Sequence, residues 1–313
     1  MKISFFIPES SLPNQKQHSM GTIPSWIYQT WLLLQTIGIS CDLVSQVPKE
    51  GIVIVHGNSS ATFLNDPHQL PKDLFIVDVV ADEFPHPAAH CYLVQNRAHA
   101  KRLPRSLFIP HWPQPNLIPR NPERGNQFEN ISFLGTLGNC DVTILSEEWN
   151  DRLRREVGVY FEYKKDPIHW HDYSTTDCIL AIRDFSRSQH FYKPATKLYN
   201  AWLAEVPFIG GRDSAYATDG HPGKDYLRAT SLNQVVQYLQ RLKEDHAFRA
   251  SLVHQGQLSG EAFTRQATLE RWQTLVQKTL PLLASHWLAL SPSKRRIFSL
   301  TQQAFCCFDY FFA

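Results

Sequence analysis

Residues 191–211 read FYKPATKLYNAWLAEVPFIGG and predict a helix that runs directly into a buried strand. The residue before a proline avoids helical backbone, so Lys193-Pro194 gives an extended entry and Pro194 opens the helix. Apolar side chains then recur at helical spacing up to Trp202. Val206-Pro207-Phe208-Ile209 predicts a short buried strand, and Gly210-Gly211 ends it with a turn where backbone can approach a ligand.

The start of this predicted helix is polar and basic. Lys193 and Lys197 flank it, and Thr196 lies near its first turn. Helix N-termini attract anions, so we expect a ligand of the pyrophosphate kind here. A solvated basic helix start in an ordinary α/β domain is the alternative interpretation.

The composition is typical of a globular protein with a large core, and the 313 residues are enough for two domains. A net charge of +2 argues against a dedicated nucleic-acid binder. The apolar run at residues 1–8 is too short for a signal peptide, and no run reaches the ~18 apolar residues of a membrane helix. The six cysteines form no CxxC pair, which favours reduced thiols. We therefore expect a cytoplasmic protein.

Apolar runs alternate with helical patterns along the whole chain. Strands are predicted at residues 2–7, 41–44, 51–57, 74–80, 91–95, 130–134, 159–163 and 178–183. Helices are predicted at residues 25–38, near Ala98, at 144–156 and through much of 231–290. Such alternation is typical of βαβ units. The expected fold class is α/β, with two Rossmann-like doubly wound domains facing each other across a cleft.

A proline-rich stretch separates the two predicted domains. Five prolines between Phe108 and Pro122 oppose regular structure and favour a stiff, extended connection. We therefore expect an N-terminal, acceptor-side domain at residues 1–107, a linker at 108–128 and a C-terminal, nucleotide-sugar-binding domain at 129–285.

The last segment, residues 286–313, combines the basic run Lys294-Arg295-Arg296 with many aromatic side chains. Two interpretations remain open for it. The segment either packs back on the body of the protein or lies on a partner or a membrane surface, as a peripheral contact at the inner face.

A resemblance to a known family covers mainly the C-terminal half. Residues 193–209 resemble the nucleotide-sugar-binding segment of two-domain glycosyltransferases of the GT-B fold, in which a run E-A-x-A-x-G-x-P-V-I contacts the donor. Residues 109–115, followed by Arg120, also look like the linker of a bacterial branch of such proteins. The resemblance implies a hexosyltransferase-type glycosyltransferase that takes a nucleotide-diphosphate sugar as substrate, needs no further cofactor and acts on a carbohydrate or glycolipid acceptor.

The chain departs from the family pattern at three positions. The glutamate that holds the ribose in many members falls on Asn200, and the earlier glutamate of the E-x7-E pattern falls on Tyr192. The glycine at the helix end falls on Glu205. Asn200 can still hydrogen-bond a hydroxyl group, but it carries no charge.

The expected donor site combines cations with a glycine turn. Arg183 ends an apolar strand, and with Lys193 and Lys197 it would neutralise the diphosphate leaving group. An ion pair of Arg183 with Asp184 or Asp177 is the alternative. Gly135 and Gly138 would let backbone N–H groups face a phosphate, although a plain turn fits them equally well. Thr196 and Asn200 complete this site.

Transfer to an acceptor hydroxyl requires a base, and the N-terminal domain offers a few candidates. Asp82 and Glu83 follow a predicted strand and His18 lies in the first loop. Asp82 is the preferred base, with a turn or cap role as its alternative, and Gly21 in the same loop as His18 would allow close approach of a substrate. The pairs His86/His90 and His169/His171 lack other ligands at metal-binding spacing, so no metal site is expected.

Two functional hypotheses follow. The first is a metal-independent glycosyltransferase. The second is a non-catalytic nucleotide or sugar-binding protein that keeps the fold after losing the acidic residues at positions 192 and 200. A transfer or hydrolysis assay with a panel of donors separates the two.

Overall fold

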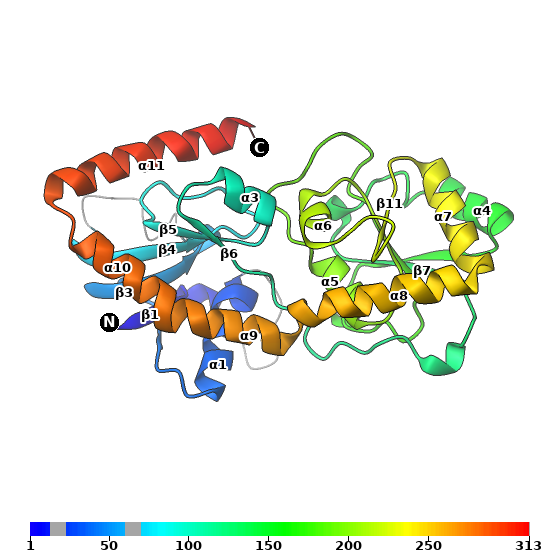
Figure 1. The fold of residues 1–313 in the computed structure, drawn as a ribbon, viewed down its shortest axis with the longest axis horizontal. Coiled ribbons are helices and arrows are strands. Elements are labelled where there is room, and N and C mark those ends of the chain that lie inside the picture. The colour runs from blue at the N-terminus through cyan, green and yellow to red at the C-terminus, as the bar shows by residue number, and fades with distance from the viewer. Residues whose placement is uncertain (13–22, 60–69, 313) are drawn as a thin grey trace. The chain divides into compact units, whose positions relative to one another are not determined.

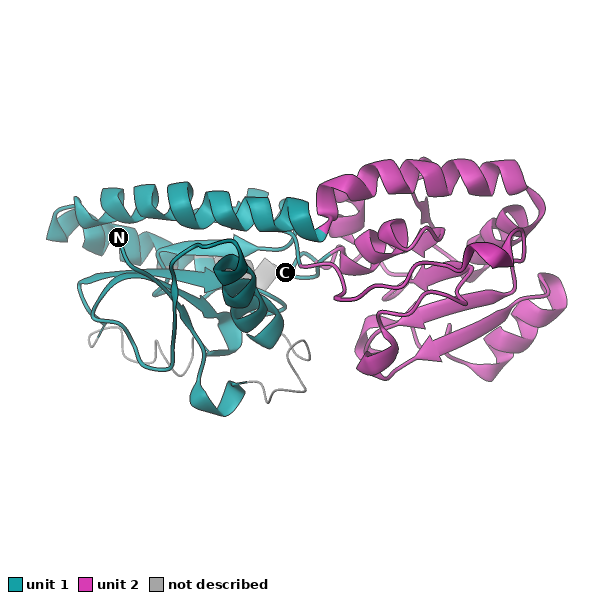
Figure 2. Cartoon of the chain, turned by 90° about the horizontal axis from the view of Figure 1, so that it is seen from below, with its two compact units in different colours: residues 1–111, 191–194, 265–313 teal, residues 112–190, 195–264 magenta. Residues whose placement is uncertain are grey.

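The computed structural model describes residues 1–12, 23–59 and 70–312, which divide into two compact units (Figure 2). Unit 1 contains residues 1–111, 191–194 and 265–313, and unit 2 contains residues 112–190 and 195–264. Each unit is built on one parallel sheet with helices beside it, so the chain is α/β (Figure 1).

The sheet of unit 1 has six parallel strands in the order β2-β1-β3-β4-β5-β6. Its centre is the pair β3–β4, which stays in register from Glu50 opposite Asp73 to His56 opposite Val79. Both strands are buried after their first residue, as expected for apolar runs in a parallel sheet. The strands are β1 Ile3–Phe6, β2 Asp42–Val44, β3 Glu50–His56, β4 Asp73–Val79, β5 Cys91–Val94 and β6 Ser106–Phe108.

Helices cover both faces of this sheet (Figure 1). The continuous helical run α9–η8–α10 lies on one face, where Trp272 is buried at 6.2 Å from the ring of Phe5. The helix α11 lies on the other face. The helical segments of unit 1 are η1 Glu9–Ser11, η2 Pro24–Tyr28, α1 Gln29–Thr36, α3 Arg97–Arg102, α9 Arg265–Thr274, η8 Leu275–Thr279, α10 Leu280–Leu288 and α11 Pro292–Phe312.

The inner face of α11 packs on the body of unit 1. Cys306 belongs to the apolar cluster around β3, β4 and β5, and Arg105 donates a hydrogen bond of 2.7 Å to Gln302. The outer face carries Ile297 and Leu300, which are 64% and 58% exposed. Within the described residues, no helix is both long and apolar enough to cross a membrane.

The sheet of unit 2 has five parallel strands in the order β11-β10-β9-β7-β8. The strands are β7 Asn130–Leu134, β8 Tyr160–Lys164, β9 Cys178–Ala181, β10 Phe208–Gly210 and β11 Leu227–Arg228. The helical segments are η4 Pro122–Arg124, η5 Leu137–Asn139, α4 Glu147–Glu156, η6 Pro167–His169, α5 Thr196–Leu203, α6 Ser214–Asp219, α7 Leu232–Glu244, α8 His246–Gly260 and η7 Glu261–Phe263.

The stretch at residues 191–211 forms the helix and strand that the sequence predicted, as α5 and β10. Trp202 anchors the helix, since its indole N–H donates to the Asp225 carbonyl at 2.8 Å. A Cβ atom at Gly256 of α8 would lie 2.5 Å from the Trp202 ring, so glycine is needed where α8 crosses this indole.

The boundaries differ from the expected domains at two places. Residues 265–285 belong to unit 1 instead of the C-terminal domain, because the apolar side of α9 packs on the first sheet. The proline-rich stretch from Trp112 onward belongs to unit 2, where Trp112 is only 1% exposed. Arg120 and Arg124 both form ion pairs with the buried carboxylate of Asp177, which fastens this stretch to the second sheet.

Candidate functional site

The carboxyl ends of β7 and β9 in unit 2 meet the N-terminus of α5. Gly135 follows β7, and Arg183 lies two residues beyond β9. Ligands of open α/β sheets bind at this edge, outside the carboxyl ends of the strands. Six donor-site residues were predicted in unit 2, and this edge brings three of them together: Gly135, Arg183 and Lys197.

Lys197 lies directly against the glycine turn. A Cβ atom built on Gly135 would be 2.9 Å from Cε and 3.1 Å from Nζ of Lys197. The backbone of Gly135 has a φ of +154°, which L-residues rarely adopt, so glycine is favoured here for both conformation and space. The Lys197 ammonium group also lies 5.2 Å from the centre of the Phe133 ring. The sequence placed Gly135 and Lys197 in one site, and the structure brings them into contact.

Thr196 adds a polar group at the same helix end. Its hydroxyl oxygen is buried and has no hydrogen-bond partner among the residues described here. The preceding residue, Ala195, caps the helix without a side-chain hydrogen bond. A helix N-terminus carries a partial positive charge and unsatisfied N–H groups, so this end of α5 is suited to an anion that accepts hydrogen bonds.

Arg183 has a partner that the sequence did not suggest. Its Nε donates to Oδ1 of Asp213 at 2.6 Å, and the two side chains are only 7% and 2% exposed. Its guanidinium group also donates to the Asn139 side chain. Asn139 ends the η5 turn that contains Gly138, so Arg183 ties this turn to the loop after β10. A Cβ atom at Gly138 would meet nothing within 4 Å, which leaves open space at that turn.

In unit 1, the carboxyl ends of the strands gather a second set of polar groups. Lys193 pairs with Asp82 at 3.1 Å, and both side chains are about one-third exposed, at 33% and 35%. The carbonyl groups of Tyr192 and Lys193 accept hydrogen bonds from Gln95 and Asn96 at the end of β5. These contacts make residues 191–194 part of unit 1, so Lys193 and Lys197 belong to different units.

Glu83 lies beside this ion pair. A Cβ atom at Gly57 would be 2.8 Å from Cβ of Glu83, so the chain needs glycine there. Burial raises the pKa of Glu83, and the charge of Asp82 raises it further, whereas Lys193 and a hydrogen bond from Asn58 act in the opposite direction. A carboxylate with a raised pKa is a better proton acceptor near neutral pH.

The sequence did not identify His56, at the end of β3. The ring is fully buried; its Nδ1 accepts a hydrogen bond from the Asn58 N–H at 3.1 Å, and its Nε2 has no partner within the described part of the chain. Burial lowers the pKa of His56 to about 4; Asp82 raises it slightly and His111 lowers it further. The ring is therefore neutral and carries its proton on Nε2. The only sequence signal was a histidine at the end of an apolar run.

No described protein family and no curated protein matches this sequence. Solved structures do match. Sucrose-phosphate synthase from Thermosynechococcus elongatus aligns over 90% of this chain and 100% of its own, with a TM-score of 0.61 and 13% identity. AviGT4, a glycosyltransferase involved in avilamycin A biosynthesis, aligns over 90% and 98%, with a TM-score of 0.57 and 12% identity. HepE from Anabaena in complex with UDP aligns over 88% and 99%, with a TM-score of 0.54 and 11% identity.

The chain has the GT-B fold. The resemblance at residues 193–209 had predicted this fold, and the two parallel sheets confirm it. The chain aligns with 58% of the length of TarM, a further structure of this kind, at a TM-score of 0.53 and 12% identity.

Asn200 stands where many GT-B glycosyltransferases place the glutamate for the ribose. It is only 5% exposed, and its Oδ1 accepts a hydrogen bond of 2.9 Å from the Gln114 N–H. It also hydrogen-bonds the Tyr173 hydroxyl. The bond from Gln114 connects α5 to the proline-rich stretch, and the bond with Tyr173 connects it to the segment before β9, so Asn200 has a structural role.

Tyr192 stands at the other position where the family pattern has a glutamate. Its ring makes edge contacts with Phe84 and His99, at centroid distances of 5.1 Å and 4.7 Å.

Two of the predicted site residues, His18 and Gly21, lie outside the described residues. In the described ranges, no three His, Cys, Asp or Glu side chains are grouped so that they could hold a metal ion.

Proposed function

We propose that this chain is a glycosyltransferase that takes its sugar from a nucleotide-diphosphate donor bound by unit 2. The contact of the Lys197 ammonium group with Gly135, at the N-terminus of α5, carries this proposal. The GT-B fold supports this proposal. Two structural neighbours support it as well: AviGT4 is a glycosyltransferase, and HepE has been solved in complex with UDP and with UDP-glucose.

The diphosphate of the donor would lie between the η5 turn and the N-terminus of α5. When the bond from the sugar C1 to the phosphate oxygen breaks, the electron pair stays on that oxygen, and Lys197 is the cation placed to stabilise it. The buried Thr196 hydroxyl would donate to a phosphate oxygen. Arg183 would act as a positioning residue, because its charge is balanced by Asp213 while its bond to Asn139 fixes the turn. We propose that this arrangement works without a metal ion.

We propose unit 1 as the acceptor side, with Asp82 as the base and Glu83 as its neighbour. The acceptor oxygen would form the new bond to C1, and its proton would pass to the Asp82 carboxylate. Lys193 would hold this carboxylate at 3.1 Å, instead of binding the donor directly. The Asp82→Asn variant should lose turnover by more than about 100-fold at unchanged UDP affinity. If Glu83→Gln has that effect and Asp82→Asn does not, the assignment of the base is wrong.

Calorimetry tests donor binding directly. UDP, GDP, ADP and TDP are titrated into the protein. If none of the four nucleotides gives binding heat, the proposal is contradicted. For a nucleotide that binds, Lys197→Met should weaken the diphosphate by about 10–100-fold and leave the free nucleoside nearly unchanged, because a charged hydrogen bond contributes roughly 1.5–3 kcal/mol. Lys165→Met, at an exposed lysine after β8, is the matched control. Equal weakening of nucleoside and diphosphate would contradict the role of Lys197.

A binding protein that performs no transfer is the second candidate. Asn200 favours this candidate, because its side chain is buried, carries no charge and hydrogen-bonds the Gln114 N–H. A donor panel assayed for transfer and for hydrolysis, with and without EDTA, decides between the two. Binding of a diphosphate without turnover of any donor supports the binding protein, and turnover that EDTA abolishes contradicts metal independence.

We also propose a peripheral membrane contact through α11. The exposed side chains of Lys294, Arg296, Ile297 and Leu300 combine basic and apolar character on its outer face. The protein should sediment with vesicles rich in phosphatidylserine, whereas the double variant Lys294→Gln/Arg296→Gln should stay in the supernatant. Equal retention by neutral vesicles would contradict the electrostatic part.

A further inference from the structure

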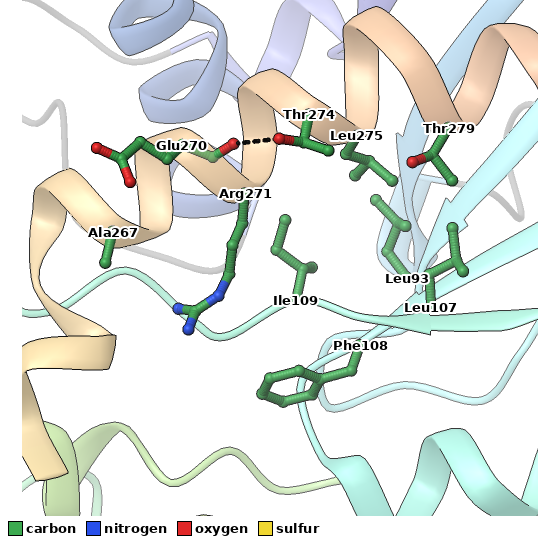
Figure 3. A pocket seen from close by; sticks show the side chains of 10 residues that line it. All are labelled: Leu93, Leu107, Phe108, Ile109, Ala267, Glu270, Arg271, Thr274, Leu275 and Thr279. Carbon is green, nitrogen blue, oxygen red and sulfur yellow. Dashed lines mark hydrogen bonds between the residues drawn. The ribbon is translucent and has the colours of Figure 1, made fainter.

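Unit 1 contains a cavity of about 480 Å³ between the sheet and the run α9–η8 (Figure 3). Its walls are mostly apolar: Leu93 comes from β5, Leu107 and Phe108 from β6, and Leu275 from η8, with Ile109 following β6. Apolar side chains of this size normally fill one another's spaces in a core, at nearly crystalline density. An open space among five of them therefore calls for a structural explanation.

Two features of the backbone keep this space open. β6 is the last strand of its sheet, and among the described residues no further strand continues the layer beyond Leu107. On the helix side, residues Leu275–Thr279 form a π-helical turn inside the run α9–η8–α10. Such turns are wider than α-helical ones, are rare and occur often at functional sites. Leu275 and Thr279, which begin and end this turn, both line the cavity.

A cation from α9 enters the cavity, although one acidic side chain also lines it. Arg271 extends from α9 into the cavity (Figure 3), and the guanidinium group of Arg97 stacks on the ring of Phe108 at 4.0 Å. Glu270 also lines the cavity, but its carboxylate accepts a hydrogen bond of 2.8 Å from Gln266 and points away from Arg271 in this view. Unit 1 as a whole carries fifteen Lys and Arg residues against ten Asp and Glu residues.

We propose that this cavity binds the alkyl or isoprenyl chain of an anionic amphipath, with Arg271 at its charged group. A mostly apolar lining with a cation toward one end (Figure 3) matches a chain that carries a phosphate, and it matches neither a free sugar nor a nucleotide. The cavity is thus assigned to the lipid portion of the acceptor, and this assignment rests on the proposed function. The proposal that the cavity binds an anionic amphipath does not depend on the proposed function.

Chain length provides a sharp test with the full-length protein. Hexyl, octyl, decyl and dodecyl phosphate are titrated below their micelle concentrations by calorimetry. Each methylene that enters an apolar cavity should raise affinity by about fourfold, and the gain should stop once the cavity is full. Dodecyl maltoside, which has the same chain and no charge, should bind about tenfold more weakly than dodecyl phosphate.

Two matched pairs of variants locate the site. Thr279→Phe should fill the cavity and weaken dodecyl phosphate by about tenfold or more, whereas Thr36→Phe at the exposed end of α1 should leave its affinity unchanged. Arg271→Gln should remove the preference for phosphate over maltoside, whereas Lys278→Gln, at an exposed lysine of η8, should keep it. Thermal melts confirm that each variant is folded.

Each outcome decides the proposal. Saturable binding with a length plateau, lost in Thr279→Phe, supports it. Absence of binding, or binding that Thr279→Phe leaves intact, overturns the cavity site, and equal affinity for phosphate and maltoside overturns the role of Arg271. UDP binding is measured on the same samples, so failure of the donor site and failure of this site are read independently.

Discussion

The two units treat a buried aspartate in opposite ways. In unit 2, Asp177 precedes β9, is 1% exposed and accepts hydrogen bonds from Arg120, Arg124 and the backbone N–H groups of Glu129 and Asn130. In unit 1, Asp78 lies within β4 and is fully buried. One of its oxygens accepts a single bond from the His86 N–H, and the other has no partner among the described residues.

This difference sets the charge of each carboxyl group. Burial alone would raise the pKa of Asp177, but the bonds from Arg124, the two backbone N–H groups and Arg120 leave it below its usual value. Burial raises the pKa of Asp78 to about 7, because one N–H is too little to offset the lost hydration. In unit 2, the buried charge of Asp177 therefore holds the proline-rich stretch through Arg120 and Arg124. In unit 1, the folded state is most stable when the Asp78 carboxyl group is neutral.

The largest expected effect is the loss of the ion pairs that Asp177 forms with Arg120 and Arg124. Asp177→Asn leaves two arginines without their carboxylate and should lower the free energy of unfolding by about 3–5 kcal/mol. Urea melts at neutral pH provide the measurement, and Asp151→Asn is the control, since its pair with Arg154 is more than half exposed on both sides, at 58% and 56%. A loss below about 1 kcal/mol would mean that the proline-rich stretch is held mainly by apolar contacts.

The two aspartates should also give opposite pH dependences. The pKa of Asp177 is lower in the folded state, so its contribution is complete above about pH 4 and disappears as the pH falls through the folded value. The pKa of Asp78 is higher in the folded state, so stability should fall by up to about 1.4 kcal/mol per pH unit as the pH rises from about 4 to 7.

Asp78→Asn tests the second half of this contrast. The variant keeps an oxygen for the His86 N–H and removes the ionisation, so its stability should lose the decline between pH 5 and pH 7 that the parent shows. Urea melts at pH 5, 6, 7 and 8 measure the slope. Asp73→Asn, at the exposed start of the same strand, should keep the slope of the parent. Parallel curves for the parent and Asp78→Asn would show that this acid is ionised when buried.

A smaller effect separates the two glycines of the turn in unit 2. Gly135→Ala would push the Lys197 ammonium group aside and strain a backbone with a φ of +154°, and should weaken a nucleoside diphosphate by about tenfold. Gly138→Ala has open space around its new methyl group and should change affinity less than about threefold. Calorimetry with UDP and uridine compares them, and equal losses would remove Gly135 from the proposed site.

Local patterns in the sequence predicted local structure well and partners poorly. The apolar runs of β3, β4 and β7 and the helix at α5 were predictable, because burial on both faces of a parallel sheet leaves a continuous apolar signal. Asp213 was missed as the partner of Arg183 because it lies thirty residues further along the chain. The return of α9 to unit 1 was missed for a similar reason. Helical spacing shows that a face is apolar, but does not show which sheet it covers.

The smallest effect concerns Glu205, at the position where the GT-B segment that residues 193–209 resemble has glycine. Val206 donates to the Ala201 carbonyl and Glu205 to the Trp202 carbonyl, so α5 ends in a Schellman motif with Glu205 at the left-handed position, at a φ of 62°. Glu205→Gly should relieve this strain and stabilise the protein by about 0.5–1 kcal/mol. Thermal melts measure the gain, and Glu205→Ala, which keeps the Cβ atom and removes the charge, should give none. If both variants gain equally, the cost of Glu205 is electrostatic. If only glycine gains, the cost of Glu205 lies in the left-handed backbone of the helix end.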